Sequence, residues 1–278
     1  MHMLPLERLI RALSVFRMAL IWGEPISASL PKLLLSSTPL PFEISTPIVL
    51  KLPMNIKVYC PLSMLVEVWL NELHVFYLMD YEQCAEFKPR RGWVVVDIGA
   101  FLGLYTLRAA RLVGPGGLVV SVEPLDEIFK LLSANVKLNE LDNVKLVKAC
   151  IAGEKGERIL YVPRSPINAS LIRGYAELMG GARRAIKVRT TTLEDLLKRI
   201  GDVDLLKLDV EGAEMEILTS VYLVPEQVGR LVVEVHADVV RPFSVSRLLE
   251  KRGYNVITYL PENTTTQVFI YAAHPSLL

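Results

Sequence analysis

Short apolar runs alternate with amphipathic segments over most of this chain. The runs that read as buried strands are 93–97, 118–122, 144–149, 204–209 and 230–235. Apolar residues recur with helical spacing at 104–113, 126–139, 192–200, 213–221 and 243–252. A strand that is apolar throughout is buried on both faces, as in a parallel sheet covered by helices. The alternation therefore predicts an α/β fold with a doubly wound, mostly parallel, Rossmann-like sheet.

The last two strand-like segments break this alternation. Residues 254–259 and 267–273 are separated by Pro261-Glu262-Asn263 and no helix. Strands with so short a connection pair antiparallel. We therefore expect a seven-stranded sheet that ends in a C-terminal antiparallel hairpin. Residues 163–185 read as a long irregular segment, and loops of that length are usually functional or disordered.

Residues 1–74 look different and are predicted to form an N-terminal extension to a domain over 75–278. The spacing at 6–22 predicts an amphipathic helix. Residues 24–54 hold six prolines, which predicts extended chain with short strands at most. A strand at 56–59 and a helix at 62–73 complete the extension. The first helix, with its arginines, can rest on a membrane surface, or pack on its own domain or on a second subunit, so oligomers stay open.

Composition narrows the setting of the protein. The net charge of +1 demands neither a nucleic acid nor an acidic partner. Three separated cysteines without a CxxC motif argue against disulfides and a zinc site, and they favour a reducing, cytoplasmic compartment. No apolar run reaches the roughly 18 residues of a membrane span. Glutamine occurs only three times, which hints at a thermophilic source.

Acids at two strand ends point to the cofactor. Asp97 ends the first strand of the domain and precedes Gly99 and Gly103, and Glu123 ends the next strand. An acid at the second position can accept hydrogen bonds from ribose hydroxyls. An acid before the glycines would repel a pyrophosphate, and GxGxxG is absent. S-adenosylmethionine, which carries an amino acid, fits better than a nicotinamide cofactor. Asp97 can also be a helix cap, and Glu123 a solvated strand end.

A second group of acids follows a later strand. Asp209 ends the run at 204–209, and Glu211 and Glu214 begin the next helix. Glu234 and His236 end the strand at 230–235, and parallel strands deliver these ends to one sheet edge. A histidine there is poised for proton transfer near neutral pH. The acids can alternatively cap the helix, and His236 can be structural.

Together these residues resemble the FkbM-like family of class I S-adenosylmethionine-dependent methyltransferases. The resemblance runs from about residue 81 to the C-terminus and rests on Asp97-Ile98-Gly99-Ala100 with Gly103, Glu123-Pro124, Thr190 to Leu196, Lys207 to Glu214, Glu234-Val235-His236 and Gly253-Tyr254. The family commonly has Asn where this chain has Phe101. The resemblance implies methyl transfer, typically to a hydroxyl oxygen.

The expected site residues follow from motif and resemblance together. We expect the cofactor beside Asp97, Gly99, Ala100, Phe101, Gly103, Glu123, Pro124, Ile151, Ala152 and Asp209. Ile151 and Ala152, which follow the strand at 144–149, can instead belong to an ordinary loop. Candidate bases for a hydroxyl acceptor are Asp209, Glu234 and His236. A divalent ion on Asp209, Glu211 and Glu234 is an alternative, although the spacing singles out no metal.

The acceptor is the least determined part. The irregular segment and the residues after it are basic, at Arg164, Arg173, Arg183, Arg184, Lys187 and Arg189. Folded over the site they would favour an anionic acceptor, and otherwise they form a solvated loop. Asn168 and Ser170 can hydrogen-bond a sugar. We expect a small metabolite, glycan or glycolipid. RNA is less favoured because no basic run interleaves with aromatics, and a non-catalytic cofactor-binding protein is the other alternative.

Overall fold

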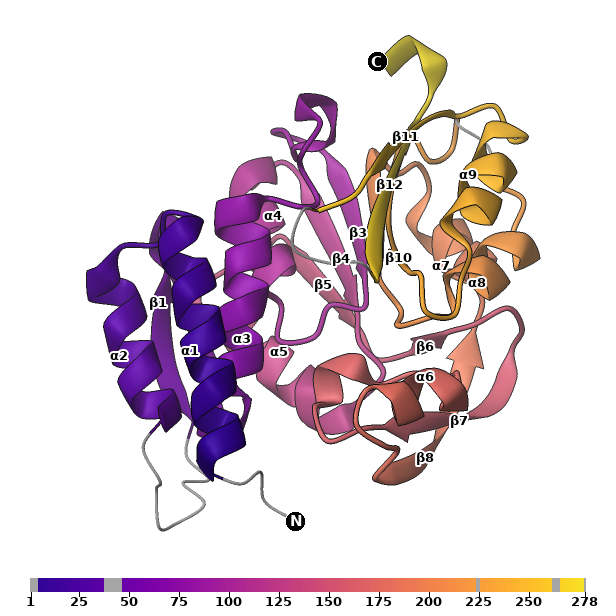
Figure 1. The fold of residues 1–278 in the computed structure, drawn as a ribbon. Coiled ribbons are helices and arrows are strands. Elements are labelled where there is room, and N and C mark those ends of the chain that lie inside the picture. The colour runs from indigo at the N-terminus through magenta and orange to yellow at the C-terminus, as the bar shows by residue number, and fades with distance from the viewer. Residues whose placement is uncertain (1–4, 38–46, 224–225, 262–265, 278) are drawn as a thin grey trace. The chain divides into compact units, whose positions relative to one another are not determined.

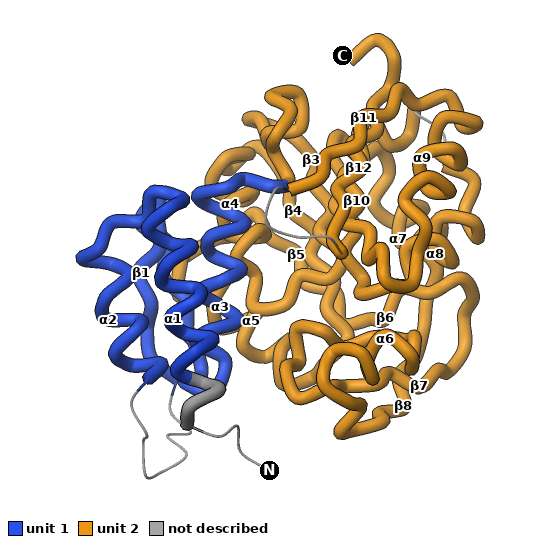
Figure 2. Tube along the Cα trace, in the orientation of Figure 1, with its two compact units in different colours: residues 1–80 blue, residues 81–278 orange. Residues whose placement is uncertain are grey.

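The chain divides into two compact units, residues 1–80 and 81–278 (Figure 2). The computed structural model describes residues 5–37, 47–223, 226–261 and 266–277, with side chains from residue 9 onward. The division follows Asp80, slightly beyond the boundary at 74 that the sequence pattern suggested. Each unit has its own buried apolar residues.

A seven-stranded sheet forms the centre of the second unit, in the order β11-β12-β10-β9-β3-β4-β5 (Figure 1). Five strands are parallel, and β12 pairs antiparallel with both β10 and β11. The predicted mostly parallel sheet and its C-terminal hairpin are confirmed. The bounds are β3 (Val94–Ile98), β4 (Leu118–Val122), β5 (Val144–Val147), β9 (Leu205–Leu208), β10 (Arg230–His236), β11 (Asn255–Tyr259) and β12 (Gln267–Ala273).

Helices connect these strands, as the alternation predicted. They are α4 (Leu104–Val113), α5 (Asp126–Leu138), α7 (Leu193–Ile200), α8 (Glu214–Ser220) and α9 (Pro242–Glu250). The chain runs outward from β3 through β4 to β5 and then returns to β9 on the other side of β3. The strand order thus reverses between β3 and β9, and open α/β sheets bind ligands beyond the carboxyl ends of the strands at such a point.

A three-stranded sheet, in the order β6-β8-β7, flanks the segment 163–185 that was predicted to be irregular. Its strands are β6 (Cys150–Ile151), β7 (Gly156–Val162) and β8 (Arg184–Thr191). Within 163–185 the chain also forms a 3₁₀ turn, Pro166–Asn168, and the short helix α6 (Arg173–Leu178). The prediction of an irregular segment was wrong in these parts. Much of β7 and β8 is exposed, so neither strand shows the continuous apolar run of a buried strand.

The first unit contains α1 (Pro5–Ile21), α2 (Ile26–Ser37) and α3 (Leu65–Glu72) with the antiparallel pair β1 (Ile48–Leu52) and β2 (Ile56–Cys60). The predicted extended chain was wrong over 26–37, because α2 is a helix that contains Pro31. The strand β1 agrees with the short strands expected in 24–54, and 38–46 lie outside the described residues. Pro31 is exposed, whereas Ser29, Lys32 and Ser36 on the same helix are buried. Tertiary contacts of these side chains outweigh the cost of an internal proline, about 3 kcal/mol.

A buried ionic cluster ties α2 to α3. The ammonium group of Lys32 contacts the carboxylates of Glu24 and Glu72, and all three side chains are at most 6% exposed. The indole Nε1–H of Trp69 donates to Glu24 Oε2 at 2.7 Å. Burial raises the pKa of Glu72 to about 7, against the opposing effect of Lys32. The cluster therefore holds two carboxylates and one ammonium inside the core of this unit.

The outer side of α1 and α2 is apolar. Ile10, Leu13 and Ile21 on α1, and Ile26 and Leu34 on α2, are each about half exposed or more. Among the residues that the structure describes, none of the helices combines the length and the hydrophobicity needed to span a bilayer. The contact of this first helix with a membrane surface stays a prediction.

Candidate functional site

Two turns meet at the carboxyl edge of the large sheet. The turn after β3 contains Gly99 and Gly103, which have φ angles of 81° and 90°. A Cβ at Gly99 would lie 1.7 Å from the backbone oxygen of Asp209, just after β9, and one at Gly103 would lie 2.4 Å from Leu132 Cδ1. Packing against the backbone therefore requires glycine at position 99, and the positive φ favours it at position 103. The first of these contacts holds the turn directly against Asp209.

Glu123, at the end of β4, holds this turn in place by hydrogen bonds. Its Oε2 accepts the Phe101 N–H at 3.0 Å, and its Oε1 accepts the Leu125 N–H at 2.9 Å. Burial raises the pKa of Glu123 to about 7, although the two N–H donors oppose the shift. Phe101 has a φ of 49°, in the left-handed region that Asn tolerates better than most residues. The backbone thus gives a conformational reason for the Asn that the family commonly carries here.

Four other predicted cofactor residues lie around this edge. Ala100 is buried next to Phe101, and Pro124 is partly exposed after Glu123. Ile151 and Ala152 are buried at β6, where the Ala152 N–H donates to the Thr191 carbonyl. The structure therefore places this last pair in the small sheet that follows β5.

A buried lysine, which the motif contained but to which no role was given, links the strand-end acids. Lys207 Nζ lies 3.2 Å from Asp97 Oδ1, 3.2 Å from Asp209 Oδ2 and 3.3 Å from the Gly99 carbonyl oxygen. Burial lowers the pKa of Lys207, but Asp97, Asp209 and Glu234 outweigh it and hold the pKa well above its usual value. A lysine inside the otherwise apolar strand β9 was the available signal.

Asp97 lies in the protein interior, next to Lys207. It is fully buried, and its Oδ2 accepts the Thr106 hydroxyl at 2.6 Å. The amino group beside it is that of Lys207. Asp97 is therefore linked to the edge through Lys207, and its contact with the cofactor stays a prediction.

Asp209 and Glu234 share a tyrosine that no sequence pattern indicated. The Tyr81 hydroxyl donates to Glu234 Oε2 at 2.5 Å and lies 3.2 Å from Asp209 Oδ2. Gln267 Nε2 donates to Glu234 Oε1 at 2.7 Å. Asp209 Oδ1 is buried and has no hydrogen-bond partner in the described part of the chain. Asp209 thus has one oxygen held in place and one buried oxygen without a hydrogen-bond partner among the described residues.

His236 sits between two carboxylates. Its Nδ1 lies 2.9 Å from Glu214 Oε1, and its Nε2 lies 3.2 Å from Glu211 Oε2. Burial lowers the pKa of His236, but Glu211 and Glu214 raise it well above its usual value. These neighbours favour the charged ring, and proton transfer by His236 stays a prediction. Burial likewise raises the pKa of Glu211 to about 8 and that of Glu234 to about 7.

The segment before β8 reaches the same cluster. The Tyr175 hydroxyl of α6 donates to Glu211 Oε2 at 2.5 Å, and its ring lies edge-on to the His236 ring at 5.2 Å between centroids. The Ser170 hydroxyl donates to the Glu211 carbonyl at 2.5 Å. Glu211 itself has a φ of 56°, so the turn after β9 is conformationally strained.

The basic residues predicted to face an anionic acceptor are exposed. Three of them have surface acids as partners: Arg173 with Glu177, Arg184 with Glu127, and Lys187 with Glu157. Such pairing reduces the positive charge left for an acceptor.

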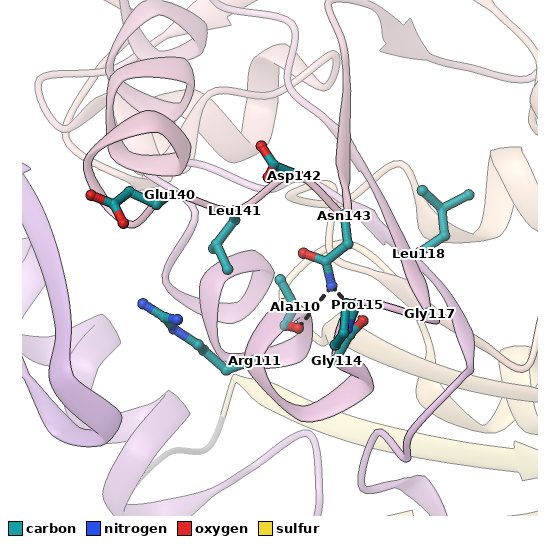
Figure 3. Close-up of a pocket in the computed structure, with 10 residues that line it drawn as sticks. All are labelled: Ala110, Arg111, Gly114, Pro115, Gly117, Leu118, Glu140, Leu141, Asp142 and Asn143. Carbon is teal, nitrogen blue, oxygen red and sulfur yellow. Dashed lines mark hydrogen bonds between the residues drawn. The ribbon is translucent and has the colours of Figure 1, made fainter.

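The opposite edge of the sheet carries a hollow of about 460 Å³ (Figure 3). Asn143 there donates its Nδ2 hydrogens to the carbonyls of Ala110 and Gly114 at 2.9 and 2.8 Å, which satisfies the C-terminus of α4. The hollow is lined from the amino ends of β4 and β5 and holds none of the strand-end acids. We therefore assign the functional site to the carboxyl edge.

One group of side chains there could hold a metal ion. Ligand atoms of Asp209, Glu234 and His236 lie within 4.8 Å of one another. Glu211, which the sequence had offered as a ligand in place of His236, is occupied by Tyr175 and His236.

Comparisons with known proteins identify the family of this chain. The chain is 31% identical over 193 residues to Methyltransferase sdnD of Sordaria araneosa, covering 58% of this chain and 73% of that protein. It is 27% identical over 192 residues to Methyltransferase 1 of Beauveria bassiana (strain ARSEF 2860), with 60% and 74% covered. M. jannaschii TYW2, solved in complex with AdoMet, aligns with a TM-score of 0.47 at 17% identity over 84% of this chain and 88% of that one. The Methyltransferase FkbM domain profile matches residues 97–256, more than half of the chain. The chain belongs to the FkbM methyltransferase domain family.

Proposed function

We propose that this methyltransferase uses S-adenosylmethionine to methylate a hydroxyl oxygen of a small metabolite, glycan or glycolipid. The observation that carries the proposal is the state of Asp209. Lys207 and Tyr81 fix its Oδ2, whereas its Oδ1 has no partner among the described residues. The Asp209 side chain is 17% exposed, more than Glu214 or Glu234. A fixed carboxylate whose second oxygen lacks a partner suits the acceptance of a hydrogen bond from a hydroxyl group.

The residues that are expected to bind the methyl donor fit S-adenosylmethionine. Each carboxylate oxygen of Glu123 accepts one backbone N–H and keeps a second lone pair. Two adjacent ribose hydroxyls can donate to those lone pairs, since Glu123 stands at the second strand end. The acids beyond β9 and β10 outnumber their cationic neighbours, which favours a positively charged donor. When bound, S-adenosylmethionine supplies an activated methyl group.

Methyl transfer by in-line displacement needs alignment and a nucleophilic acceptor oxygen. Asp209 Oδ1 accepts the hydroxyl hydrogen and so aims the oxygen lone pair. As the new O–C bond forms, the hydroxyl proton passes to Asp209. Tyr81 lies between Asp209 and Glu234, so the proton has a hydrogen-bonded route to Glu234. His236 holds Glu211 and Glu214 in place and is not needed as the base.

Asp209→Asn tests this assignment. We expect S-adenosylhomocysteine to bind within about threefold of wild type by calorimetry, because Glu123 is untouched. Turnover of hydroxylated acceptors in a methyl-donor assay should fall by roughly 10²–10⁴-fold, the size of a general-base contribution. Asp126→Asn is the matched control, since Asp126 is a surface acid paired with lysines. Wild-type turnover in Asp209→Asn would remove this role, and absence of S-adenosylhomocysteine binding to the native chain would remove the cofactor.

A further inference from the structure

Two carboxylates and one imidazole converge at the ends of two neighbouring strands. Leu208 of β9 is in register with Val233 of β10, so Asp209 and Glu234 follow on adjacent strands. Glu234 and His236 are two residues apart on β10 and therefore point to the same face. We propose that Asp209, Glu234 and His236 form a binding site for one divalent transition-metal ion.

The spacing suits a single ion. Ligand atoms bound to one ion at about 2.1 Å lie from about 3.0 Å apart when adjacent to about 4.2 Å apart when opposite. The three ligand atoms lie within 4.8 Å of one another, and His236 Nε2 is 3.9 Å from Glu234 Oε1. Small side-chain movements, on the order of 0.5 Å, bring all three ligand atoms to these separations.

All three ligands have outer partners, and those of Glu234 are Tyr81 and Gln267, which donate to its two oxygens. Glu214 binds the Nδ1 side of His236 and directs Nε2 toward the other acids. Metal-binding histidines nearly always donate their second ring N–H to such a carboxylate. Lys207 holds Asp209 Oδ2 and leaves the buried, unpaired Oδ1. This arrangement of outer partners is more specific than a cluster of acids.

The charges favour a dication. Asp209, Glu211, Glu214 and Glu234 lie together with little exposure, and the nearby basic side chains are Lys207 and His236. A divalent ion would neutralise the excess of carboxylates, and it would take the place of a proton on His236 Nε2. One nitrogen and two oxygen donors suit Mn²⁺ or Zn²⁺ better than Ca²⁺, which prefers oxygen ligands alone.

The consequence for chemistry rests on the proposed function. An ion at Asp209 Oδ1 would stand where the acceptor hydroxyl is proposed to bind. A hydroxyl oxygen bound to the ion would lose its proton more easily. Asp209 would then position the ion as well as the acceptor.

Binding of the metal alone tests the site without reference to activity. The whole chain is stripped with a chelator, dialysed and titrated with Mn²⁺, and free Mn²⁺ is followed by electron paramagnetic resonance without S-adenosylmethionine. We expect one saturable Mn²⁺ per chain. Glu234→Gln and His236→Asn should weaken binding by at least tenfold. Glu214→Gln, which touches only the outer partner, should weaken it by roughly 10–100-fold. Asp126→Asn should bind as wild type, and circular dichroism checks that each variant is folded.

Two results would overturn the site: no saturable binding of Mn²⁺ or Zn²⁺ to the wild-type chain, or equal affinity in wild type, Glu234→Gln and His236→Asn. The first result would leave His236 as the charged partner of its two glutamates. A chain that binds S-adenosylhomocysteine and methylates acceptors at full rate in chelator, without binding metal, loses this site and keeps the proposed function. A chain that binds Mn²⁺ here but not S-adenosylhomocysteine keeps this site and loses the proposed function.

Discussion

Replacing Lys207 with methionine should destabilise the second unit by about 3–5 kcal/mol, the usual cost of leaving a buried charge without its partner. Methionine keeps most of the aliphatic stem but removes the ammonium group. That group is 3.2 Å from one oxygen of Asp97 and 3.2 Å from one oxygen of Asp209. Asp97 is fully buried and would keep the Thr106 hydroxyl as its hydrogen-bond donor.

Burial decides the size of this effect. The Lys207 side chain is 3% exposed and lies over the Tyr81 ring at 4.9 Å from the ring centroid. A lysine paired at the surface contributes at most about 1 kcal/mol. Lys198, which pairs with Glu194 on α7 and is 64% exposed, provides that comparison. We expect Lys198→Met to leave stability unchanged within the error of the measurement.

Urea unfolding followed by circular dichroism measures both variants. The pKa of Lys207 is held above 10.5, so the stability from its ammonium is fully present below that pH and disappears only as the pH rises through the higher folded value. The deficit of the Lys207→Met protein should therefore be read near pH 7, where the wild-type contribution does not vary.

A second substitution separates charge from packing. Adding Asp97→Asn to Lys207→Met removes the buried carboxylate that lost its cation, and it should restore at least half of the lost stability. Asp97→Asn alone should destabilise the protein, because Lys207 then loses a partner. A Lys207→Met protein within about 1 kcal/mol of wild type, or a double variant without recovery, would refute the reasoning.

Three further predictions concern other parts of the chain. The pKa of Glu72 is raised from 4.5 to about 7, so its stability contribution is present below pH 4.5 and is lost as the pH rises through 7; in urea titrations Glu72→Gln should remove this pH-dependent loss, and an unchanged pH profile would contradict it. Glu140 has a φ of 54° just after α5, so Glu140→Gly should add about 1 kcal/mol, measured as a rise in Tm of roughly 2–4 °C; an unchanged Tm would contradict this. The apolar face of α1 should carry the chain to anionic vesicles in flotation, and Ile21→Asn should reduce the bound fraction; equal flotation of both proteins would exclude this face.

The large sheet could be predicted because its parallel strands are apolar along their whole length. That pattern survives in the sequence without knowledge of any partner. The helix α2 could not, because Pro31 predicts a break and the contacts that compensate come from Glu24 and Glu72, the latter far along the chain. The strands β7 and β8 were missed because both are largely exposed.

Those residues of the candidate site that lie at strand ends could be predicted from the sequence. Asp97, Glu123, Asp209, Glu234 and His236 all follow apolar strands, and topology alone brings them to one edge. Tyr81 and Tyr175 come from outside the strands, and no periodicity marks them. The charge state of His236 depends on Glu211 and Glu214, whose distances from the ring follow only from the three-dimensional structure.

The turn that is expected to face the methyl donor and the carboxylate that is proposed to bind the acceptor are rigidly connected. Gly99 lies so close to the backbone of Asp209 that no side chain fits between them. Lys207 binds the Gly99 carbonyl and the Asp209 carboxylate at once. A shift of the turn that is expected to face the methyl donor must therefore move the oxygen that is proposed to aim the acceptor hydroxyl. Methyl transfer depends on the alignment of donor, methyl group and acceptor. The motif after β3 and the motif after β9 thus set one geometry, which explains why a glycine and a lysine with no chemistry of their own belong to the site.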